Sequence, residues 1–402
     1  MKNISTNLII LTSFLIPLGI GTQNLSLILL FAAALFTYKN KKGIKAKDPK
    51  ALYVLILYPI ILILSSIDNL PFLIENPNLF LAVVIPLLLS INHELNKQDL
   101  NRILSAFVVS VSLLSFAKTT VFIYQQGIEN LLILPQKKLA SLLIGYSYLN
   151  LSMYVGSAIL FSIYLMKGKT TKKNILITNS LFLFLFLVFL SSRVVLVTTL
   201  LIVLLLFLAN APKNKRFFVI GAFGTFVFIS SLAAYMVDTP IVEKMKEAVN
   251  YNNEYSNIKE KWGGRIMRQE IWTCAIMLIK EKPIFGYGYD NVQNELNECY
   301  EKTSKHPVLY RVKSKKNAHN QFFQMTLASG ALGLFTFLAA VVYGLRKSII
   351  KKDILLFSFI TFTLLCFLTE SHLERNHTIY LFYFFVSLLL HQTPYVKYTN
   401  PK

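Results

Sequence analysis

Long apolar runs, separated by short polar segments, recur along almost the whole chain. Runs such as Leu181–Leu190 and Val194–Leu208 do not alternate polar and apolar positions, which favours membrane helices over the strands of a membrane barrel. A bilayer is crossed by about 20 apolar residues in a helix. The pattern predicts twelve spans, near residues 7–21, 24–38, 51–66, 79–92, 103–124, 149–166, 175–191, 194–210, 217–236, 319–344, 354–370 and 379–391.

Composition agrees with this pattern, since 54% of the residues are hydrophobic and the mean hydropathy is +0.53. We therefore predict an all-α, polytopic integral membrane protein with no separate soluble domain of ordinary size. The N-terminal segment, with Lys2 ahead of the apolar run Leu8–Ile20, has the pattern of a signal peptide. No Ala-x-Ala cleavage site follows and another apolar run starts at Leu25, so we expect an uncleaved first span.

Positive charge predicts the orientation, because Lys and Arg accumulate in cytoplasmic loops. They cluster after the second, fourth, sixth, eighth and tenth predicted spans. The short connections on the other side hold only Lys137, Lys138, Arg193 and Arg375. We therefore expect both termini in the cytoplasm. This bias accounts for most of the net charge of +21, so the charge requires no nucleic-acid partner.

One connection, residues 237–318, is long enough to fold outside the bilayer. The predicted organisation is nine membrane helices in 1–236, an outer loop with short amphipathic helices in 237–318, and three membrane helices with a cytoplasmic tail in 319–402. Cys274 and Cys299 lie in the loop, where a disulfide is allowed but two cysteines without geometry do not establish one. Cys366 lies in an apolar span, which favours a packed thiol.

Two helices are predicted within the outer loop. Thr239 and Pro240 are typical of a helix start and predict a short helix to about Val249. A second helix is predicted after the start signal Trp262-Gly263-Gly264 and up to Pro283, because apolar residues recur there at helical spacing.

Arg265 and Arg268 fall in the first turn of the second predicted loop helix. Cations are unfavourable at a helix N-terminus, so two arginines there favour a bound anion, and their planar forks suit phosphate. The alternative is a pair of solvated surface arginines. Of the two, we favour the anion site.

After this helix, the stretch from Phe285 to Asn291 predicts a turn with exposed tyrosines, Tyr287 and Tyr289, as a platform for sugars. It is not a phosphate-binding Gly-x-Gly-x-x-Gly motif, because Asn291 stands in place of the third glycine. A basic run follows, which is either a solvated face or a contact for anionic headgroups or a phosphorylated acceptor. It comprises Lys302, Lys305, Arg311, Lys313, Lys315 and Lys316.

At His319 a polar loop enters an apolar helix. On a continuous helix, Gly330 and Gly333 would lie about 20° and 40° from the azimuth of His319. This face predicts close packing of the glycines in the bundle, with His319 at the membrane surface, where a base could meet a lipid-borne substrate. The alternative is a polar cap on a helix that merely packs.

Arg193 separates two apolar runs, and charges within membrane segments are functional candidates. The charge-derived orientation places it on the same side as Arg265 and His319. The connection 370–377 reaches that side too, so His372, His377 and Arg375 are lesser candidates, for which interfacial solvation is the favoured interpretation. The sequence has no His-Glu-x-x-His, paired-Cys or Asp-x-Asp motif, so we predict no metal site.

At these residues the chain resembles the O-antigen ligase family of bacterial inner membranes. That family has a twelve-span plan with one long periplasmic loop before a late helix. Its signature is His, then Asn, Ser or Gln, nine residues, Gly, two residues and a Gly-like position, which His319, Asn320, Gly330 and Gly333 satisfy. The resemblance covers the layout of the whole chain, but its specific motifs lie only in 192–193, 263–288 and 319–333. Arg193 and Arg265 look like the family's two essential arginines.

The resemblance implies a metal-independent, inverting glycosyltransferase of the membrane-embedded type, without a cofactor. Its donor would be a glycan on undecaprenyl diphosphate, and its acceptor the outer core of lipid A-core. The active site would face the periplasm, among membrane lipids. His319 would act as general base, and Arg193 and Arg265 would hold the diphosphate. Arg268 joins the donor-binding candidates, and further substrate-binding candidates are Trp272, Tyr287, Tyr289, Asn320 and Arg375.

Two rival functions remain open at the level of sequence. An O-antigen polymerase would use the same donor, although the His319 motif and the single large loop favour the ligase. A flippase or transporter of lipid-linked glycans would place charges along its spans, whereas only Lys118 lies well inside one.

Overall fold

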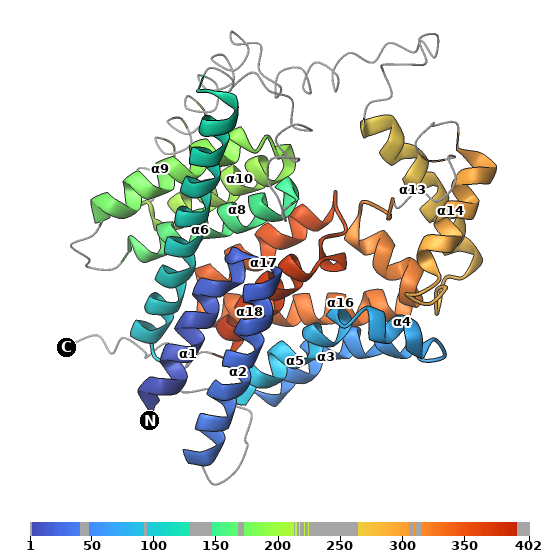
Figure 1. Ribbon diagram of the computed structural model, residues 1–402, viewed down its shortest axis with the longest axis horizontal. Helices are drawn as coiled ribbons and strands as arrows, with labels where there is room; N and C mark the ends of the chain where they lie inside the picture. Colours follow the sequence, from blue (N-terminus) through green and yellow to red (C-terminus); the bar gives the residue numbers. More distant parts are fainter. Residues whose placement is uncertain are drawn as a thin grey trace.

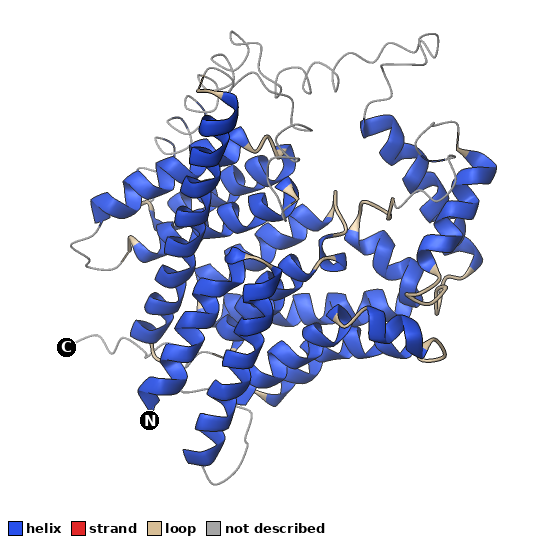
Figure 2. Cartoon of the chain, in the orientation of Figure 1, coloured by secondary structure: helices blue, strands red, loops and turns tan. Residues whose placement is uncertain are grey.

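The computed structural model describes residues 2–40, 48–91, 95–128, 147–167, 173–212, 264–304 and 316–391, with the single positions 214, 217, 221, 224 and 309. This part of the chain is helical and contains no strand (Figures 1 and 2). The elements are α1 Lys2–Leu15, η1 Ile16–Leu18, α2 Ile20–Asn40, α3 Pro49–Leu64, α4 Leu70–Glu75, α5 Asn78–Ile91, α6 Lys97–Gln126, α8 Tyr148–Leu165, α9 Lys173–Phe189, α10 Arg193–Asn210, α13 Gly264–Glu281, α14 Val292–Thr303, α16 Gln321–Lys351, α17 Ile354–Phe367, η4 His372–Glu374 and α18 Asn376–Leu390.

The helices follow the predicted spans closely. Every predicted span overlaps a helix except the ninth, 217–236, most of which lies outside the described residues. Four helices, α2, α6, α8 and α16, are long and apolar enough to cross a bilayer, and seven shorter apolar helices accompany them. The all-helical class with several apolar helices able to span a membrane is therefore confirmed. The number of spans and the division into domains stay predictions.

Short polar residues begin several of these helices, because a side-chain oxygen there can accept the free N–H groups of the first turn. Asp48 accepts from the Ala51 N–H ahead of α3, and Asn96 forms a reciprocal capping box with Asp99 at the start of α6. Asp353 caps α17 in the same way. Local sequence thus explains where the apolar runs begin as helices.

The core lies around α18, which is buried along its whole length. Phe385 of this helix contacts Phe107 of α6 and Phe161 of α8, with ring centroids 4.9 and 4.7 Å apart. Figure 1 shows α18 in the interior of the bundle, among helices from both ends of the chain. Aromatic packing around one central helix therefore joins the two halves of the sequence.

The predicted continuous helix after His319 is wrong in one respect. Within α16, Ser329 (φ −134°, ψ 16°) and Gly330 (φ 61°, ψ −162°) leave helical geometry, and the two halves run in different directions (Figure 1). Moreover, His319 precedes the helix, which begins at Gln321. A rotation of 100° per residue cannot be carried across such a break, so the predicted common face of His319, Gly330 and Gly333 does not form.

The break is filled by the turn between α13 and α14. A regular helix would join the Ala331 N–H to the Leu327 carbonyl and the Leu332 N–H to the Ala328 carbonyl. Here these four groups bond to the turn instead, since Tyr287 and Gly288 donate to Leu327 and Ala328 at 2.8 and 3.0 Å. Conversely, Ala331 and Leu332 donate to Pro283 and Ile284 at 2.8 and 3.3 Å. The turn and the broken helix therefore satisfy each other's backbone.

Glycine is required where the two backbones meet. A Cβ on Gly330 would lie 2.1 Å from the Ile284 carbonyl oxygen, and one on Gly286 would lie 2.5 Å from the Leu327 carbonyl oxygen. Both residues also have positive φ values, 61° and 69°. The expected close approach of a backbone to Gly330 is thus confirmed, but the approaching segment is the loop turn.

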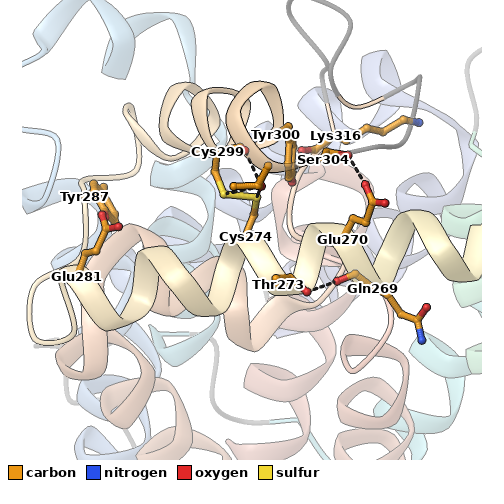
Figure 3. Close-up of a disulfide and its surroundings, with 11 residues drawn as sticks. Gln269, Glu270, Thr273, Cys274, Glu281, Tyr287, Cys299, Tyr300, Ser304 and Lys316 are labelled. Atoms are coloured by element: carbon orange, nitrogen blue, oxygen red, sulfur yellow. Dashed lines mark hydrogen bonds between the residues drawn. A yellow bond between two sulfur atoms is a disulfide. The ribbon is translucent and has the colours of Figure 1, made fainter.

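The helix predicted from Gly264 to Pro283 is confirmed as α13, whereas the helix predicted from Thr239 lies outside the described residues. Cys274 of α13 and Cys299 of α14 form a disulfide, which answers the question that the sequence leaves open (Figure 3). Cys366 is buried, as expected for a packed thiol. The disulfide joins α13 and α14 into a hairpin, and α14 carries Tyr300, whose hydroxyl donates to the Lys316 carbonyl at 3.3 Å.

Candidate functional site

His319 is held by its backbone neighbours just ahead of α16. The Trp272 indole N–H donates to the Ala318 carbonyl at 3.1 Å, and the Ala318 N–H donates to Gln324 Oε1 at 3.1 Å. Asn320 caps α16 and donates from Nδ2 to the Leu368 carbonyl at 2.9 Å. These bonds keep His319 at φ 44°, a left-handed conformation that is costly for a non-glycine residue. The surroundings therefore determine where the imidazole lies.

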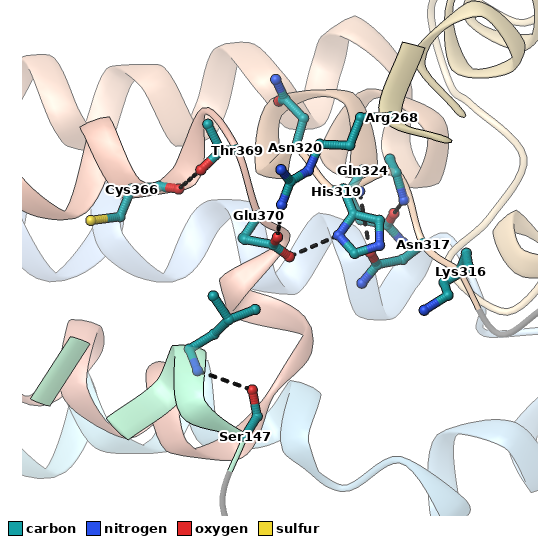
Figure 4. A network of polar contacts seen from close by, with 12 residues as sticks. Ser147, Arg268, Lys316, Asn317, His319, Asn320, Gln324, Cys366, Thr369 and Glu370 are labelled. Carbon is teal, nitrogen blue, oxygen red and sulfur yellow. Dashed lines mark hydrogen bonds and ion pairs between the residues drawn. The ribbon is translucent and has the colours of Figure 1, made fainter. Parts of the chain in front are cut away.

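Three elements meet at the imidazole. Nδ1 of His319 lies 2.8 Å from Oε2 of Glu370 in the connection between α17 and α18. The other oxygen of Glu370 accepts from Nη2 of Arg268, on α13, at 2.5 Å. Figure 4 shows the Glu370 carboxylate joined by dashed lines to both His319 and Arg268. Only 17% of the His319 side chain and 10% of the Glu370 side chain are exposed, so solvent screens this triad weakly.

Glu370 remains ionised in this environment. Burial raises the pKa of its carboxyl, but the hydrogen bond with His319 and the charges of His319 and Arg268 outweigh burial and hold the pKa at about 2. An anionic Glu370 can only accept a hydrogen bond, so Nδ1 of His319 carries the proton that it donates to Glu370. Nε2 then carries the lone pair in the neutral ring.

Nε2 of His319 has no hydrogen-bond partner among the described residues, although it is buried. A buried polar atom without a partner is uncommon and calls for an explanation. The arrangement matches a general base: one ring nitrogen is oriented by a carboxylate, and the other is available to a substrate hydroxyl.

Tyr148 lies at the start of α8. Glu370, Arg268, Arg193 and Arg375 all act electrostatically on its hydroxyl. Arg193 is exposed at the start of α10, two residues after Ser191, whose φ of 51° is another strained backbone angle.

Arg265 lies in the first turn of α13, as predicted, but its side chain is outside the described residues. Arg268 pairs with Glu370 of the chain itself, and the bound anion predicted at Arg265 and Arg268 stays a prediction. Arg268 is therefore neither a solvated surface arginine nor wholly available to a ligand.

Two candidates on the turn do not form the predicted exposed platform. Tyr287 is buried, and its hydroxyl donates to Glu281 at 2.9 Å. Tyr289 is half-buried, and its hydroxyl donates to Glu374 at 2.8 Å. The prediction is wrong because the turn packs into the break of α16, which carries both rings inward.

Trp272 and Asn320 support the His319 backbone, as described above. Of the lesser candidates, Arg375 is exposed, as interfacial solvation requires. His372 and His377 are buried, so interfacial solvation is wrong for both. Burial, helped by the charge of Arg375, lowers the pKa of His372 to about 4. Nδ1 of His377 lies 2.7 Å from Nε2 of Gln23.

Sequence reasoning did not single out Glu370 or Glu374 as site residues. Burial raises the pKa of Glu374 to about 7 against the opposing hydrogen bonds from Tyr289 and Gln324. A usable signal existed, since both acidic residues lie in a short connection between two apolar spans. The described residues contain no group of three His, Cys, Asp or Glu side chains placed to hold a metal ion.

Comparison with known proteins finds a matching family. A model described as O-Antigen ligase matches residues 178–338, which include most of α9, all of α10, α13 and α14, and the start of α16. No curated protein matches the chain.

Proposed function

We propose that this chain, whose residues 178–338 match a family model described as O-Antigen ligase, is a membrane-embedded glycosyltransferase acting as an O-antigen ligase. It transfers a glycan from undecaprenyl diphosphate to an outer-core sugar of lipid A-core. The observation that carries the proposal is His319, whose Nδ1 contacts Glu370 while Nε2 is buried without a partner.

In the proposed reaction, the acceptor hydroxyl oxygen attacks the anomeric carbon of the donor glycan from the face opposite the diphosphate. The new bond is from carbon to the acceptor oxygen, and the bond that breaks joins the anomeric carbon to the phosphate oxygen. The departing electron pair stays on the diphosphate, and the configuration inverts. Nε2 of His319 takes the hydroxyl proton.

Glu370 is a positioning residue in this scheme. Its carboxylate selects the tautomer with the proton on Nδ1 and stabilises the imidazolium that forms, as the aspartate does in a serine protease triad. Arg268 in turn holds Glu370 in place. Arg193, which is exposed, and Arg265 bind the diphosphate and balance its growing charge, for which bidentate guanidinium groups are suited.

The family and the apolar helices suggest a multi-pass membrane protein. We place it in the bacterial inner membrane with both termini in the cytoplasm and the 237–318 loop, His319 and Arg193 on the periplasmic side. The reaction uses no metal ion and no nucleotide, because cleavage of the lipid diphosphate supplies the driving force.

The test is reconstitution of the purified chain with lipid-linked glycan, with and without lipid A-core. Glycosylated lipid A-core that still forms in the presence of a chelator supports the ligase. Lengthened lipid-linked glycan without lipid A-core would identify a polymerase instead, and donor crossing the bilayer with no bond broken would identify a transporter. His319→Ala should lower transfer by about 10² to 10⁴, the usual contribution of a positioned base. Donor binding by this variant should be unchanged.

A further inference from the structure

The second half of α16 and the helix α3 pack side by side in opposite directions. Contacts near each end of this pair define two levels along the helix axes. At one level, Lys347 and Tyr343 of α16 bond to Asp48, the cap of α3, the tyrosine at 2.8 Å. At the other level, Tyr58 of α3 stacks edge-on against Phe337, with ring centroids 5.6 Å apart. Beyond it lies the break in α16.

The distance between these levels fits a bilayer. From Ala331 to Lys347, α16 is roughly 24 Å long at about 1.5 Å per residue, which covers most of the hydrocarbon thickness of about 30 Å. No charged residue occurs between Gln321 and Leu345. The break in α16 therefore lies near one membrane surface, with the Asp48 and Lys347 level near the other.

The turn between α13 and α14 lies at the level of the break, because its backbone bonds to Leu327, Ala328, Ala331 and Leu332. A second attachment ties it to the end of α3. Asp290 accepts from the Ser66 hydroxyl and from Asn69 Nδ2, each at 3.0 Å. The turn is thus fixed at the membrane surface from two sides.

Two large apolar side chains of this turn are mostly exposed among the described residues. Ile284 is 60% exposed and Phe285 is 73% exposed. The adjoining short helix α4, which follows Asn69, also exposes Leu70 and Ile74. Exposed lysines, Lys280 and Lys282, precede the two residues in the chain. Apolar side chains beside lysines are typical of elements that lie in a lipid headgroup region.

We propose that the α13–α14 turn is a membrane-surface anchor: Ile284 and Phe285 insert into the leaflet on the His319 side, and Lys280 and Lys282 contact lipid phosphates. The occupant is lipid, because the turn is held at the depth where α3 and α16 leave the hydrocarbon region.

Anchoring the turn would also position the helix α13, which carries two contacts to the site. Trp272 of α13 donates to the Ala318 carbonyl beside His319, and Arg268 of the same helix pairs with Glu370, the partner of His319. Holding the C-terminal end of α13 at the bilayer surface therefore sets the height of the His319–Glu370 pair above the lipid. This inference goes beyond glycosyl transfer and does not depend on it.

The test uses the full chain in vesicles of phosphatidylethanolamine and phosphatidylglycerol. Phe285→Cys carries an environment-sensitive fluorophore in a Cys366→Ala background, since Cys274 and Cys299 are already bonded to each other. Lys302→Cys on the exposed face of α14 is the matched control. With a nitroxide on the lipid near the headgroup, quenching at position 285 should exceed that at 302 by about twofold or more.

Equal quenching at both positions, or none at 285, would overturn the anchor. A blue-shifted emission at 285 without quenching by lipid would mean that a protein, such as a second copy, covers the turn, which also overturns it. If the Phe285→Cys variant has a lower melting temperature than the Cys366→Ala protein that carries it, Ile284→Cys serves as the second reporter position. No glycan enters this assay, so its outcome is separate from that of the proposed function.

Discussion

At the residue scale, the chemistry of His319 depends on two side chains from other parts of the sequence. Glu370 orients the ring through Nδ1, and Arg268 occupies the other oxygen of the same carboxylate. Each bond is short and shielded, so the three residues should act as a unit in which the loss of one disables the others.

Glu370→Gln should therefore lower kcat/KM for transfer by roughly 10² to 10⁴, because a neutral amide neither selects the tautomer nor stabilises the imidazolium. The double variant with His319→Ala should be no slower than His319→Ala alone. Steady-state kinetics of the single and double variants check this, with the exposed Glu298→Gln as control. Additive losses would show that Glu370 acts on something other than His319.

Arg193→Lys and Arg265→Lys should each lower transfer about 10²-fold or more while expression stays normal. A lysine keeps the charge but lacks the bidentate fork that fits a diphosphate. Measuring transfer at saturating acceptor, together with donor binding, checks this. If both lysine variants keep near wild-type activity, these residues do not hold the leaving group.

Glu374 predicts a pH dependence of stability. The pKa of Glu374 in the folded protein, about 7, lies above the ordinary value of 4.5. Its contribution to the free energy of unfolding is therefore fully present below pH 4.5 and is lost as the pH rises through 7. Glu374→Gln resembles the neutral acid. The free energy of unfolding of the variant, relative to that of the wild type, should increase by on the order of 1 to 3 kcal/mol as the pH rises from 5 to 8. Unfolding measured at both pH values checks this, and a constant difference would contradict it.

At the element scale, α16 is two helices joined by an irregular pair of residues, and the α13–α14 turn supplies the bonds that the break removes. The disulfide from Cys274 to Cys299 then keeps α13 and α14 together. Closing a loop of this length contributes about 3 to 4 kcal/mol in the chain-entropy model. The hairpin, the break and the His319 segment should therefore fold as one cooperative unit.

Gly330→Ala should destabilise the protein strongly. The positive φ costs about 1 to 3 kcal/mol for a residue with a Cβ, before the clash with the Ile284 carbonyl is counted. Gly21→Ala in α2 is the matched control, because nothing lies within 4 Å of its added Cβ. Thermal unfolding in detergent checks both. Equal melting temperatures for the two variants would mean that the break in α16 is not required.

At the scale of the whole molecule, the candidate residues share one side only if the predicted orientation holds. A membrane-impermeant thiol reagent should label Lys173→Cys from the cytoplasm and Asn257→Cys from the opposite side, because positive charge favours cytoplasmic loops. Labelling of intact cells against inverted vesicles checks this. If both positions react from the same side, the shared outer side of Arg193, Arg265 and His319 is lost.

The sequence by itself determined most of the helices and one segment of the site. Apolar runs and helical spacing act over a few neighbours, so they predicted the overlap of the spans with helices and the presence of α13. The family motif likewise singled out His319. These features need no knowledge of what packs against them.

Only the tertiary structure decided how the site is assembled. Glu370 lies 51 residues from His319 in the sequence, and the turn that holds Gly286 reaches α16 more than 40 residues away. The break at Gly330, the burial of Tyr287 and the disulfide all result from segments that meet in space. A helical period predicts what one helix would do alone, whereas hydrogen bonds freed at a break are satisfied by whichever segment packs there.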